Sequence, residues 1–274
     1  MNRMHIAFFD MDGTLTEARK NISDEMIAAI NDLSKYCHIG IVTGSGFSYV
    51  EEQVGDLFGE DQDRLDGGSI GLYPCNGTQS WWHNGENFQL DSEASMIREI
   101  GEQNLRDLCS FLLQQQLACI SDFPEMPVTG DFIVNRGSML NYCPPGRSCS
   151  NSQRKKFTDL DAQRGIRLQV FRRLKTYLEQ KGIGCVAALG GNTSIDIYPE
   201  GWDKTYVLGH YNFTKASFVG DRCFEGGNDK TIYDELNKGD NSVAYATTSP
   251  EHTIKIIREK LIPHFSYPED QEQK

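Results

Sequence analysis

Two aspartates, Asp10 and Asp12, follow a short run of apolar residues near the start of the chain. Gly13 and Thr14 come next, so the apolar run leads into two carboxylates, a residue that permits a turn, and a hydroxyl. Side chains two residues apart point in the same direction while the backbone stays extended. Such a pair can hold a cation, attack a phosphoryl group or move a proton. The alternative is a surface turn, in which Asp and Gly are common.

The first two predicted strands both end in residues that could carry chemistry. The apolar run before Asp10 is short and unbroken, as in a strand that is covered on both faces of a parallel sheet. A second such run ends in residues 43–46, Thr-Gly-Ser-Gly. One helical pattern separates the two strands, and another runs from about residue 50 to residue 58. We therefore expect a βαβα arrangement with its polar residues at the carboxyl edge of a parallel sheet.

The middle of the chain has a different pattern. Helical and extended segments do not alternate there as a doubly wound sheet requires, which favours an inserted antiparallel α+β module. A hairpin is expected before this region, around 82–88. The expected elements of the module are a helix from about 92 to 117, strands at 132–134 and 138–142, helices at 152–163 and 167–181, and a strand at 194–198.

The parallel-sheet pattern then resumes. Its expected elements are a strand at 216–219 that ends before Asp221, a helix around Ile232, a strand at 242–246, a helix at 253–261, and a polar tail that is frayed from residue 267. The predicted fold class is therefore α/β. A Rossmann-like core with a parallel sheet is expected from residues 1–90 and 200–274, and an inserted α+β domain with an antiparallel sheet and helices from residues 91–199.

Composition and charge argue against several functional classes for this chain. The 274 residues carry a net charge of −12, which opposes nucleic acid or an anionic membrane as a partner. No stretch approaches the length of a membrane span, and the first strand begins too early to leave room for a signal peptide, so we expect a cytoplasmic protein. The eight cysteines form no CxxC pair and the six histidines show no ligand spacing, which favours reduced thiols over a zinc site.

One region is basic although the whole chain is acidic. Residues 131–181 contain eleven Lys and Arg residues against four Asp and Glu residues. A locally basic region suits a small anionic substrate, although a helix with a solvated charged face explains some of these residues. We expect solvated surface positions for Lys155, Lys156, Arg164, Arg167, Arg172 and Arg173.

Phosphoryl transfer gives one explanation for several strand-end and loop features. It needs a nucleophile, a cation, and donors around the phosphoryl oxygens. The donors would be Thr43 or Ser45 together with Lys204. An oxygen-rich Mg²⁺ site would use Asp10 and Asp221, with a backbone carbonyl near Asp12. The late segment 226–229, Gly-Gly-Asn-Asp, adds Asp229 to this metal set.

The order of these motifs resembles the haloacid dehalogenase superfamily. A closer resemblance, to the eukaryotic-type phosphomannomutases, spans nearly the full chain and includes both the core and the inserted domain. It rests on residues 9–16, on Arg136 followed by residues 139–141, on residues 146–150, on Asp196 before residues 199–204, and on residues 226–229.

The resemblance implies a function and a role for each matched residue. The chain would interconvert mannose 6-phosphate and mannose 1-phosphate, with Mg²⁺ and with mannose 1,6-bisphosphate or glucose 1,6-bisphosphate as activator, and would feed GDP-mannose synthesis. Asp10 would become phosphorylated, while Asp12 would protonate the leaving sugar oxygen or deprotonate the incoming one. The resemblance also implies a homodimer that forms through the inserted domain. The residues that would bind substrate are Arg19, Arg136, Arg147, Arg154, Ser194 and Asp196.

The arginines of the inserted domain could also form the second anion site that a mutase needs. The bisphosphate intermediate of a mutase carries phosphates at both ends, so that a second anion site must hold one phosphate while the other is at Asp10. Guanidinium groups bind phosphate through paired hydrogen bonds, which Lys does less well.

The chain also departs from the family pattern. Residues 43–46 stand where the family usually shows Gly-Gly-Ser-Asp, residues 75–77 are Cys-Asn-Gly instead of Glu-Asn-Gly, and residues 220–223 are Gly-Asp-Arg-Cys instead of Gly-Asp-Lys-Thr. Thr43 resembles the threonine of phosphatases in the wider superfamily, so a sugar-phosphate phosphatase is the alternative function. A non-catalytic sugar-phosphate-binding protein is a second alternative.

Overall fold

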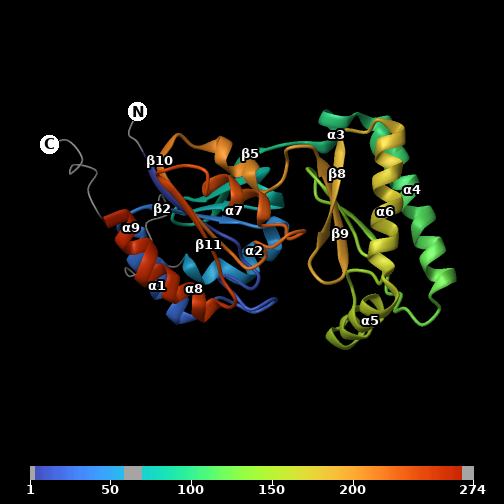
Figure 1. Cartoon of the computed structure of the whole chain (residues 1–274), viewed down its shortest axis with the longest axis horizontal. Helices are drawn as coiled ribbons and strands as arrows, with labels where there is room; N and C mark the ends of the chain where they lie inside the picture. The colour runs from blue at the N-terminus through green and yellow to red at the C-terminus, as the bar shows by residue number, and fades with distance from the viewer. Residues whose placement is uncertain (1–3, 59–69, 267–274) are drawn as a thin grey trace. The chain divides into compact units, whose positions relative to one another are not determined.

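The computed structural model describes residues 4–58 and 70–266 (Figure 1). The chain divides into two compact units, Met1–Glu93 with Asp203–Lys274, and Ala94–Trp202. We call them the core unit and the inserted unit. The boundaries expected from the sequence, 90/91 and 199/200, lie three residues before these. The polar tail that was expected to fray lies outside the described residues. Within the described part of the chain, no helix is both long and apolar enough to cross a membrane.

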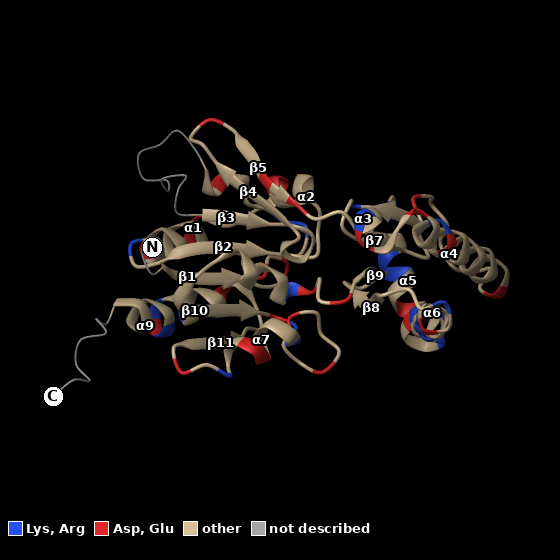
Figure 2. Ribbon diagram, turned by 90° about the horizontal axis from the view of Figure 1, so that it is seen from above, with Lys and Arg blue, Asp and Glu red and all other residues tan. Residues whose placement is uncertain are grey.

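The core unit contains a seven-stranded sheet. Its five strands β11, β10, β1, β2 and β3 are parallel neighbours, and β4 and β5 extend the sheet as an antiparallel hairpin. Figure 2 shows the arrowheads of the parallel strands pointing the same way, so that their carboxyl ends share one edge. In sheet order the strands are β11 Ser242–Ala246, β10 Phe213–Gly220, β1 Met4–Phe9, β2 His38–Val42, β3 Ile70–Tyr73, β4 Gln79–His83 and β5 Phe88–Glu93.

Strand β1 is buried on both faces, which explains its unbroken apolar sequence. Ala7 and Phe9 belong to the hydrophobic cluster that also contains side chains of helices α1, α2 and α8. Ile6 and Phe8 point to the other face and belong to a cluster with side chains of α7. These helices are α1 Asp24–Ser34, α2 Phe47–Val54, α7 Lys230–Leu236 and α8 Pro250–Ile256. A parallel sheet covered on both faces is the α/β arrangement predicted from the sequence, which is confirmed.

The C-terminal helix is longer than expected. The prediction was residues 253–261, whereas α8 continues through the π-helical turn Ile257–Leu261 into α9, Ile262–Ser266. Pro263 lies within α9 and has no backbone N–H to donate to the preceding turn. The wider π turn directly before it accommodates this missing hydrogen bond.

Short helical turns lie between the longer elements of the core unit. One follows α2, one follows β3 and one precedes β10. The turns are η1 Gly55–Leu57, η2 Cys75–Gly77 and η3 Lys204–His210.

The inserted unit has a four-stranded antiparallel sheet with its own core. Figure 1 shows α4 and α6 on one face of this sheet, where their apolar side chains form a cluster with those of β7 and β9. In sheet order the strands are β6 Ile133–Asn135, β7 Leu140–Tyr142, β9 Ser194–Pro199 and β8 Cys185–Gly190. The helices are α3 Met96–Ile100, α4 Glu102–Asp122, α5 Asn151–Arg164 and α6 Ile166–Lys181.

Two expectations for the inserted unit were wrong. The single helix from about 92 to 117 begins only at Met96, because β5 extends to Glu93, and it is interrupted at Gly101. Gly101 has φ +84°, a left-handed conformation that cannot continue a helix. Strand β8 was not predicted, since its short apolar sequence shows no clear alternation.

Candidate active site

Lys204 joins two carboxylates inside the core unit. Its ammonium group donates to Oδ1 of Asp10 and, at 2.6 Å, to Oδ1 of Asp229. The side chains of Lys204 and Asp229 are fully buried, and that of Asp10 is almost so. A buried charge needs a partner and hydrogen bonds to offset its lost hydration, and the two carboxylates provide both for Lys204.

The backbone brings these side chains together from distant parts of the sequence. Asp10 follows β1, and its N–H donates to the carbonyl of Val219 in β10 at 2.9 Å. Lys204 begins η3, where the side chain of Asp203 caps the turn by accepting from the N–H of Thr205 at 2.8 Å. Asp229 lies immediately before α7. The parallel pairing of β1 with β10 therefore places the ends of both strands at one edge of the sheet.

Three carboxylates form a cluster that could hold a cation. One oxygen each of Asp10, Asp221 and Asp229 lies within 4.8 Å of the other two. Gly13 makes room for this cluster, because a Cβ at that position would stand 2.7 Å from Oδ2 of Asp221. One lysine leaves an excess of negative charge, and oxygen ligands of this kind suit a hard divalent cation.

Burial raises the pKa of Asp10 to about 8, although Lys204 works in the opposite direction. Burial and the neighbouring Asp229 also raise the pKa of Asp221. For Lys204 burial disfavours the charged form, but the two carboxylates outweigh it and raise the pKa of the ammonium group. The site therefore favours a proton or another cation near Asp10 at neutral pH.

Asp12 belongs to a different set of hydrogen bonds. Its Oδ1 accepts from the hydroxyl of Tyr49 at 3.1 Å and from Nε2 of Gln53 at 3.4 Å. The backbone N–H of Arg19 also donates to this oxygen at 3.4 Å. Asp12 is not a member of the carboxylate cluster. From the sequence, a backbone carbonyl near Asp12 was expected to bind the metal, and this contact stays a prediction.

Arg19 is exposed and has a left-handed backbone conformation, with φ +65°. Its predicted contact with substrate phosphate also stays a prediction. Tyr49 and Gln53 were not singled out from the sequence, although their spacing of four residues in α2 places them on the same helix face.

The loop with Thr43 and Ser45 lies at the same edge of the sheet as Asp10. Strand β2 pairs in parallel with β1, with Phe9 opposite Ile41, and Thr43 follows directly after β2. Thr43 is buried, and its Oγ1 accepts from the N–H of Ser45 at 3.2 Å. This arrangement is compatible with the predicted phosphoryl contacts of both hydroxyls.

Gly46 explains one departure from the family pattern. It is the N-cap residue of α2, with an extended backbone and no side-chain hydrogen bond to the helix. The first turn of α2 therefore has no capping hydrogen bond from a side chain, which the Asp expected from the family pattern could supply.

Three of the predicted substrate-binding residues lie in or near the strand pair β7 and β9. Asn141 of β7 stands opposite Asp196 of β9 and donates to its Oδ1 at 2.6 Å. Arg136 lies 3.9 Å from the same carboxylate oxygen. Ser194 also belongs to β9, where its Oγ donates to the carbonyl of Gly190 at 2.9 Å. Asn141 lies in the motif of residues 139–141, but no hydrogen bond or substrate contact was predicted for it from the sequence.

The other two predicted arginines of the inserted unit lie together. Arg154 donates to Oγ1 of Thr193 at 3.0 Å and reaches the backbone carbonyl of Arg147 at 3.5 Å. Thr193 had not been singled out from the sequence. Its position one residue before Ser194 connects this arginine pair with the start of β9.

Arg167 corrects an expectation from the sequence. It was expected to be a solvated surface charge, yet its side chain is only 17% exposed and pairs with Asp161 at 2.6 Å. It also donates to the carbonyl of Gly191 at 3.0 Å, so that it fixes the turn between β8 and β9 to the junction of α5 and α6. No sequence pattern indicated this contact, because it depends on how the helices pack on the sheet.

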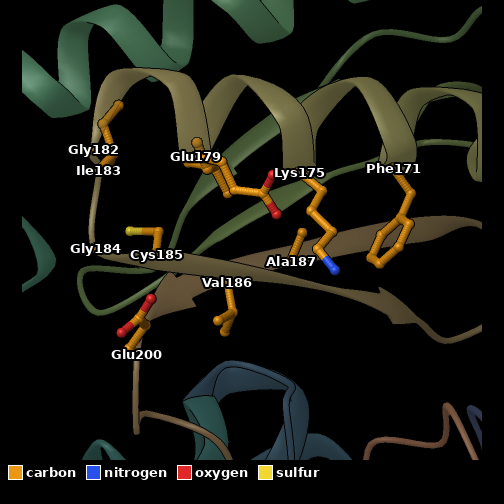
Figure 3. Close-up of a pocket in the computed structure, with 11 residues that line it drawn as sticks. Phe171, Lys175, Glu179, Gly182, Ile183, Gly184, Cys185, Val186, Ala187 and Glu200 are labelled. Carbon is orange, nitrogen blue, oxygen red and sulfur yellow. The ribbon is translucent and has the colours of Figure 1, made fainter.

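A cavity of about 500 Å³ lies between α6 and β8 in the inserted unit (Figure 3). Its walls include Phe171, Lys175, Glu179 and Cys185, and none of the residues predicted to bind substrate. Burial raises the pKa of Cys185 to about 12, with Glu200 adding to the effect, so that this thiol is not a reactive nucleophile at neutral pH.

The pairing of Lys204 predicts a pH-dependent loss of stability in the variant Lys204→Met. The variant leaves two buried carboxylates without their cation, and we expect it to lower the free energy of unfolding by about 3–5 kcal/mol near pH 8. The loss should be smaller near pH 5, because Asp10, whose pKa is raised to about 8, then takes up a proton. Denaturant unfolding at the two pH values measures both effects.

The matched control is Lys35→Met. Lys35 pairs with Asp32 at the surface, where the two side chains are 65% and 53% exposed, and its removal should change the free energy of unfolding little at either pH. Equal stability of Lys204→Met and the unmodified chain at pH 8 would contradict the assigned role of the buried pair.

Solved structures with a similar fold include several phosphatases. The chain matches a Plasmodium falciparum IMP-nucleotidase with a TM-score of 0.63 at 13% identity, over 96% of this chain and 68% of the other. It matches an Aspergillus fumigatus trehalose-6-phosphate phosphatase with a TM-score of 0.51 at 13% identity, over 95% and 93% of the two chains. At this identity the likeness concerns the fold alone, which is that of haloacid dehalogenase-type phosphatases.

Sequence comparison is more specific. The family model for eukaryotic phosphomannomutase matches residues 26–263. A phosphomannomutase from Arabidopsis thaliana is 33% identical over 261 residues, which cover 91% of this chain and 93% of the relative. Phosphomannomutase 1 from Mus musculus is 34% identical over 266 residues, with coverage of 96% and 94%. The chain therefore belongs to the eukaryotic phosphomannomutase family.

Proposed function

We propose that this chain is a phosphomannomutase that interconverts mannose 6-phosphate and mannose 1-phosphate, with Asp10 as the nucleophile. The observation that carries the proposal is the buried pairing of Asp10 with Lys204, beside the carboxylates of Asp221 and Asp229. Lys204 fixes one oxygen of Asp10 and can offset charge on the phosphoryl group. The family to which the chain belongs supports the choice of a mannose phosphate as substrate.

The reaction then consists of two transfers in opposite directions. An oxygen of Asp10 attacks one phosphorus atom of a hexose 1,6-bisphosphate, the bond from phosphorus to the sugar oxygen breaks, and Asp12 gives that oxygen a proton. A monophosphate next offers its free hydroxyl to the aspartyl phosphate, and Asp12 takes up the hydroxyl proton as the new phosphate ester forms. The bisphosphate is regenerated and Asp10 is free again.

The arginines of the inserted unit would bind the phosphate that is not reacting. Arg147 and Arg154 lie together, and Arg136 lies beside Asp196, which could receive a sugar hydroxyl. Planar guanidinium groups bind phosphate through paired hydrogen bonds. We also assign Ser194 to this set, and Arg19, Thr43 and Ser45 to phosphate contacts in the core unit.

A coupled assay tests the proposed reaction. Mannose 1-phosphate with Mg²⁺ and glucose 1,6-bisphosphate should yield mannose 6-phosphate, and Asp10→Asn should lower the rate by more than about 10³-fold, because the nucleophile is lost. The variant Asp32→Asn, which changes an exposed carboxylate of α1, is the matched control. Free phosphate without mannose 6-phosphate would instead identify the alternative, a sugar-phosphate phosphatase, which the resemblance of Thr43 to the threonine of such enzymes suggests.

We further propose Mg²⁺ as the cation of the carboxylate cluster. Asp10, Asp221 and Asp229 would hold it, and it would supply positive charge to the transferring phosphoryl group. Their oxygen donors match the preference of this ion for carboxylates. Lys204 donates to Oδ1 of the fully buried Asp229, and this hydrogen bond fixes the orientation of the carboxylate.

Stabilisation by Mg²⁺ should depend on pH. The raised pKa of Asp10, about 8, means that the fold without a cation binds a proton there and loses stability as the pH rises toward 8. Bound Mg²⁺ must displace this proton, so its affinity should fall about tenfold for each pH unit below 8. Thermal unfolding with and without Mg²⁺ at pH 6 and pH 8 should show the larger increase of Tm at pH 8.

The control for this experiment is Asp221→Asn, which removes one proposed ligand. It should abolish most of the increase in Tm at pH 8. An increase that is the same at both pH values, or that persists in this variant, would contradict the assignment of the cluster.

We also propose a homodimer that forms through the inserted unit. Leu113, Leu117 and Ile120 of α4 are 59%, 68% and 38% exposed, and their spacing places them on one side of the helix. Residues 108–121 contain no Lys, Arg, Asp or Glu. The chain has a net charge of −12, and a stripe without charge lets two copies meet with little mutual repulsion.

The cytoplasmic location and the link to GDP-mannose synthesis stay predictions.

The variant Leu117→Glu tests the dimer. It places a charge at the centre of the stripe and should convert a dimer into a monomer in analytical ultracentrifugation, without lowering the stability of either unit. Leu90→Glu changes a leucine of β5 that is 46% exposed and should leave the dimer intact. A monomeric unmodified chain, or a dimer that survives Leu117→Glu, would contradict this interface.

A further inference from the structure

The carboxylate of Asp12 is held at only one of its two oxygens. The hydroxyl of Tyr49, Nε2 of Gln53 and the backbone N–H of Arg19 all donate to Oδ1, at 3.1, 3.4 and 3.4 Å. Among the residues that the structure describes, no side chain or backbone group hydrogen bonds to Oδ2. The three donors therefore fix the position of Oδ1, and Oδ2 is the oxygen that these donors leave open to a further partner.

The helix that carries two of these donors is itself fixed. Gln53 is 2% exposed, its Oε1 accepts from Oγ1 of Thr16 at 2.7 Å, and its carbonyl accepts from the N–H of Ile22 at 2.8 Å. Tyr49 lies one turn earlier in α2 and is about half buried. Burial and the adjacent Asp12 raise the pKa of Tyr49 to about 12, so the phenol keeps its proton and remains a donor.

We propose that Tyr49 is a positioning residue that anchors Oδ1 of Asp12, so that Oδ2 is the oxygen that exchanges the proton with the sugar. This inference rests on the proposed function, in which Asp12 is the acid and base of both transfers. When the bond from phosphorus to the sugar oxygen breaks, the proton passes from Oδ2 of Asp12 to that oxygen. Tyr49 keeps its own proton throughout. In the reverse transfer, Oδ2 receives the proton of the attacking hydroxyl.

The anchoring matters only for a leaving group that needs a proton. A sugar alkoxide is a poor leaving group, so its departure depends on where Asp12 presents the proton. Acetate leaves acetyl phosphate without protonation. Tyr49 should therefore affect transfer from a sugar phosphate and have little effect on phosphorylation of Asp10 by acetyl phosphate.

The variant Tyr49→Phe tests this inference, because it removes the hydroxyl and keeps the ring. In the mutase assay kcat should fall about tenfold or more, with KM changed less than about twofold, since only the placement of Asp12 changes. The rate at which acetyl phosphate labels Asp10 should stay within about twofold of the unmodified enzyme. Tyr36→Phe, at an exposed tyrosine 44% accessible to solvent, is the matched control and should change neither rate.

The outcomes separate this inference from the proposed function. An unmodified chain that forms no mannose 6-phosphate refutes the mutase and, with it, the role of Tyr49. An active mutase whose Tyr49→Phe variant keeps its kcat refutes the role of Tyr49 alone. An equal loss with acetyl phosphate and with the sugar phosphate would also overturn the inference, because it would show that Tyr49 supports the fold of the site and not the placement of a proton.

Discussion

The burial of the Lys204 ammonium group between Asp10 and Asp229 is the constraint on which the site depends. A charge without access to water must be matched by charges that the fold brings to it, and here these come from the end of β1 and from the start of α7. The same lysine does not fully compensate three carboxylates. The excess negative charge makes the cluster suitable for a cation. Burial raises the pKa of Asp10, and the neighbouring carboxylates of Asp229 and Asp221 add to this effect.

The two aspartates of the opening motif have separate surroundings although only Met11 lies between them. Asp10 lies among buried charges, whereas Asp12 lies among neutral donors from α2 and the backbone of Arg19. These different surroundings are consistent with the two proposed roles, bond formation to phosphorus for Asp10 and proton transfer for Asp12. This division follows from which elements cover each side chain, since the residue type is the same.

Sequence patterns predicted what is local and missed what depends on packing. The apolar run before Asp10, the second strand before Thr43 and the late segment around Asp229 all mark strand or helix ends, so their common edge could be inferred. The contact between Tyr49 and Asp12 joins residues 37 positions apart, and the burial of Arg167 depends on the turn between β8 and β9. The spacing of apolar residues along a helix shows which face is buried, but it does not show which strand end that face contacts.

The parallel pairing of β1 with β10 also has a consequence for synthesis of the chain. Phe9 pairs with Val219, so the central sheet cannot close until the ribosome has released nearly the whole chain. The inserted unit is complete at Trp202 and has its own hydrophobic cluster. It therefore has everything needed to fold while Lys204, Asp221 and Asp229 are still to be synthesised, and domains generally fold as units during synthesis. Asp10 is thus synthesised early, and the charged groups that surround it in the folded core unit are synthesised late.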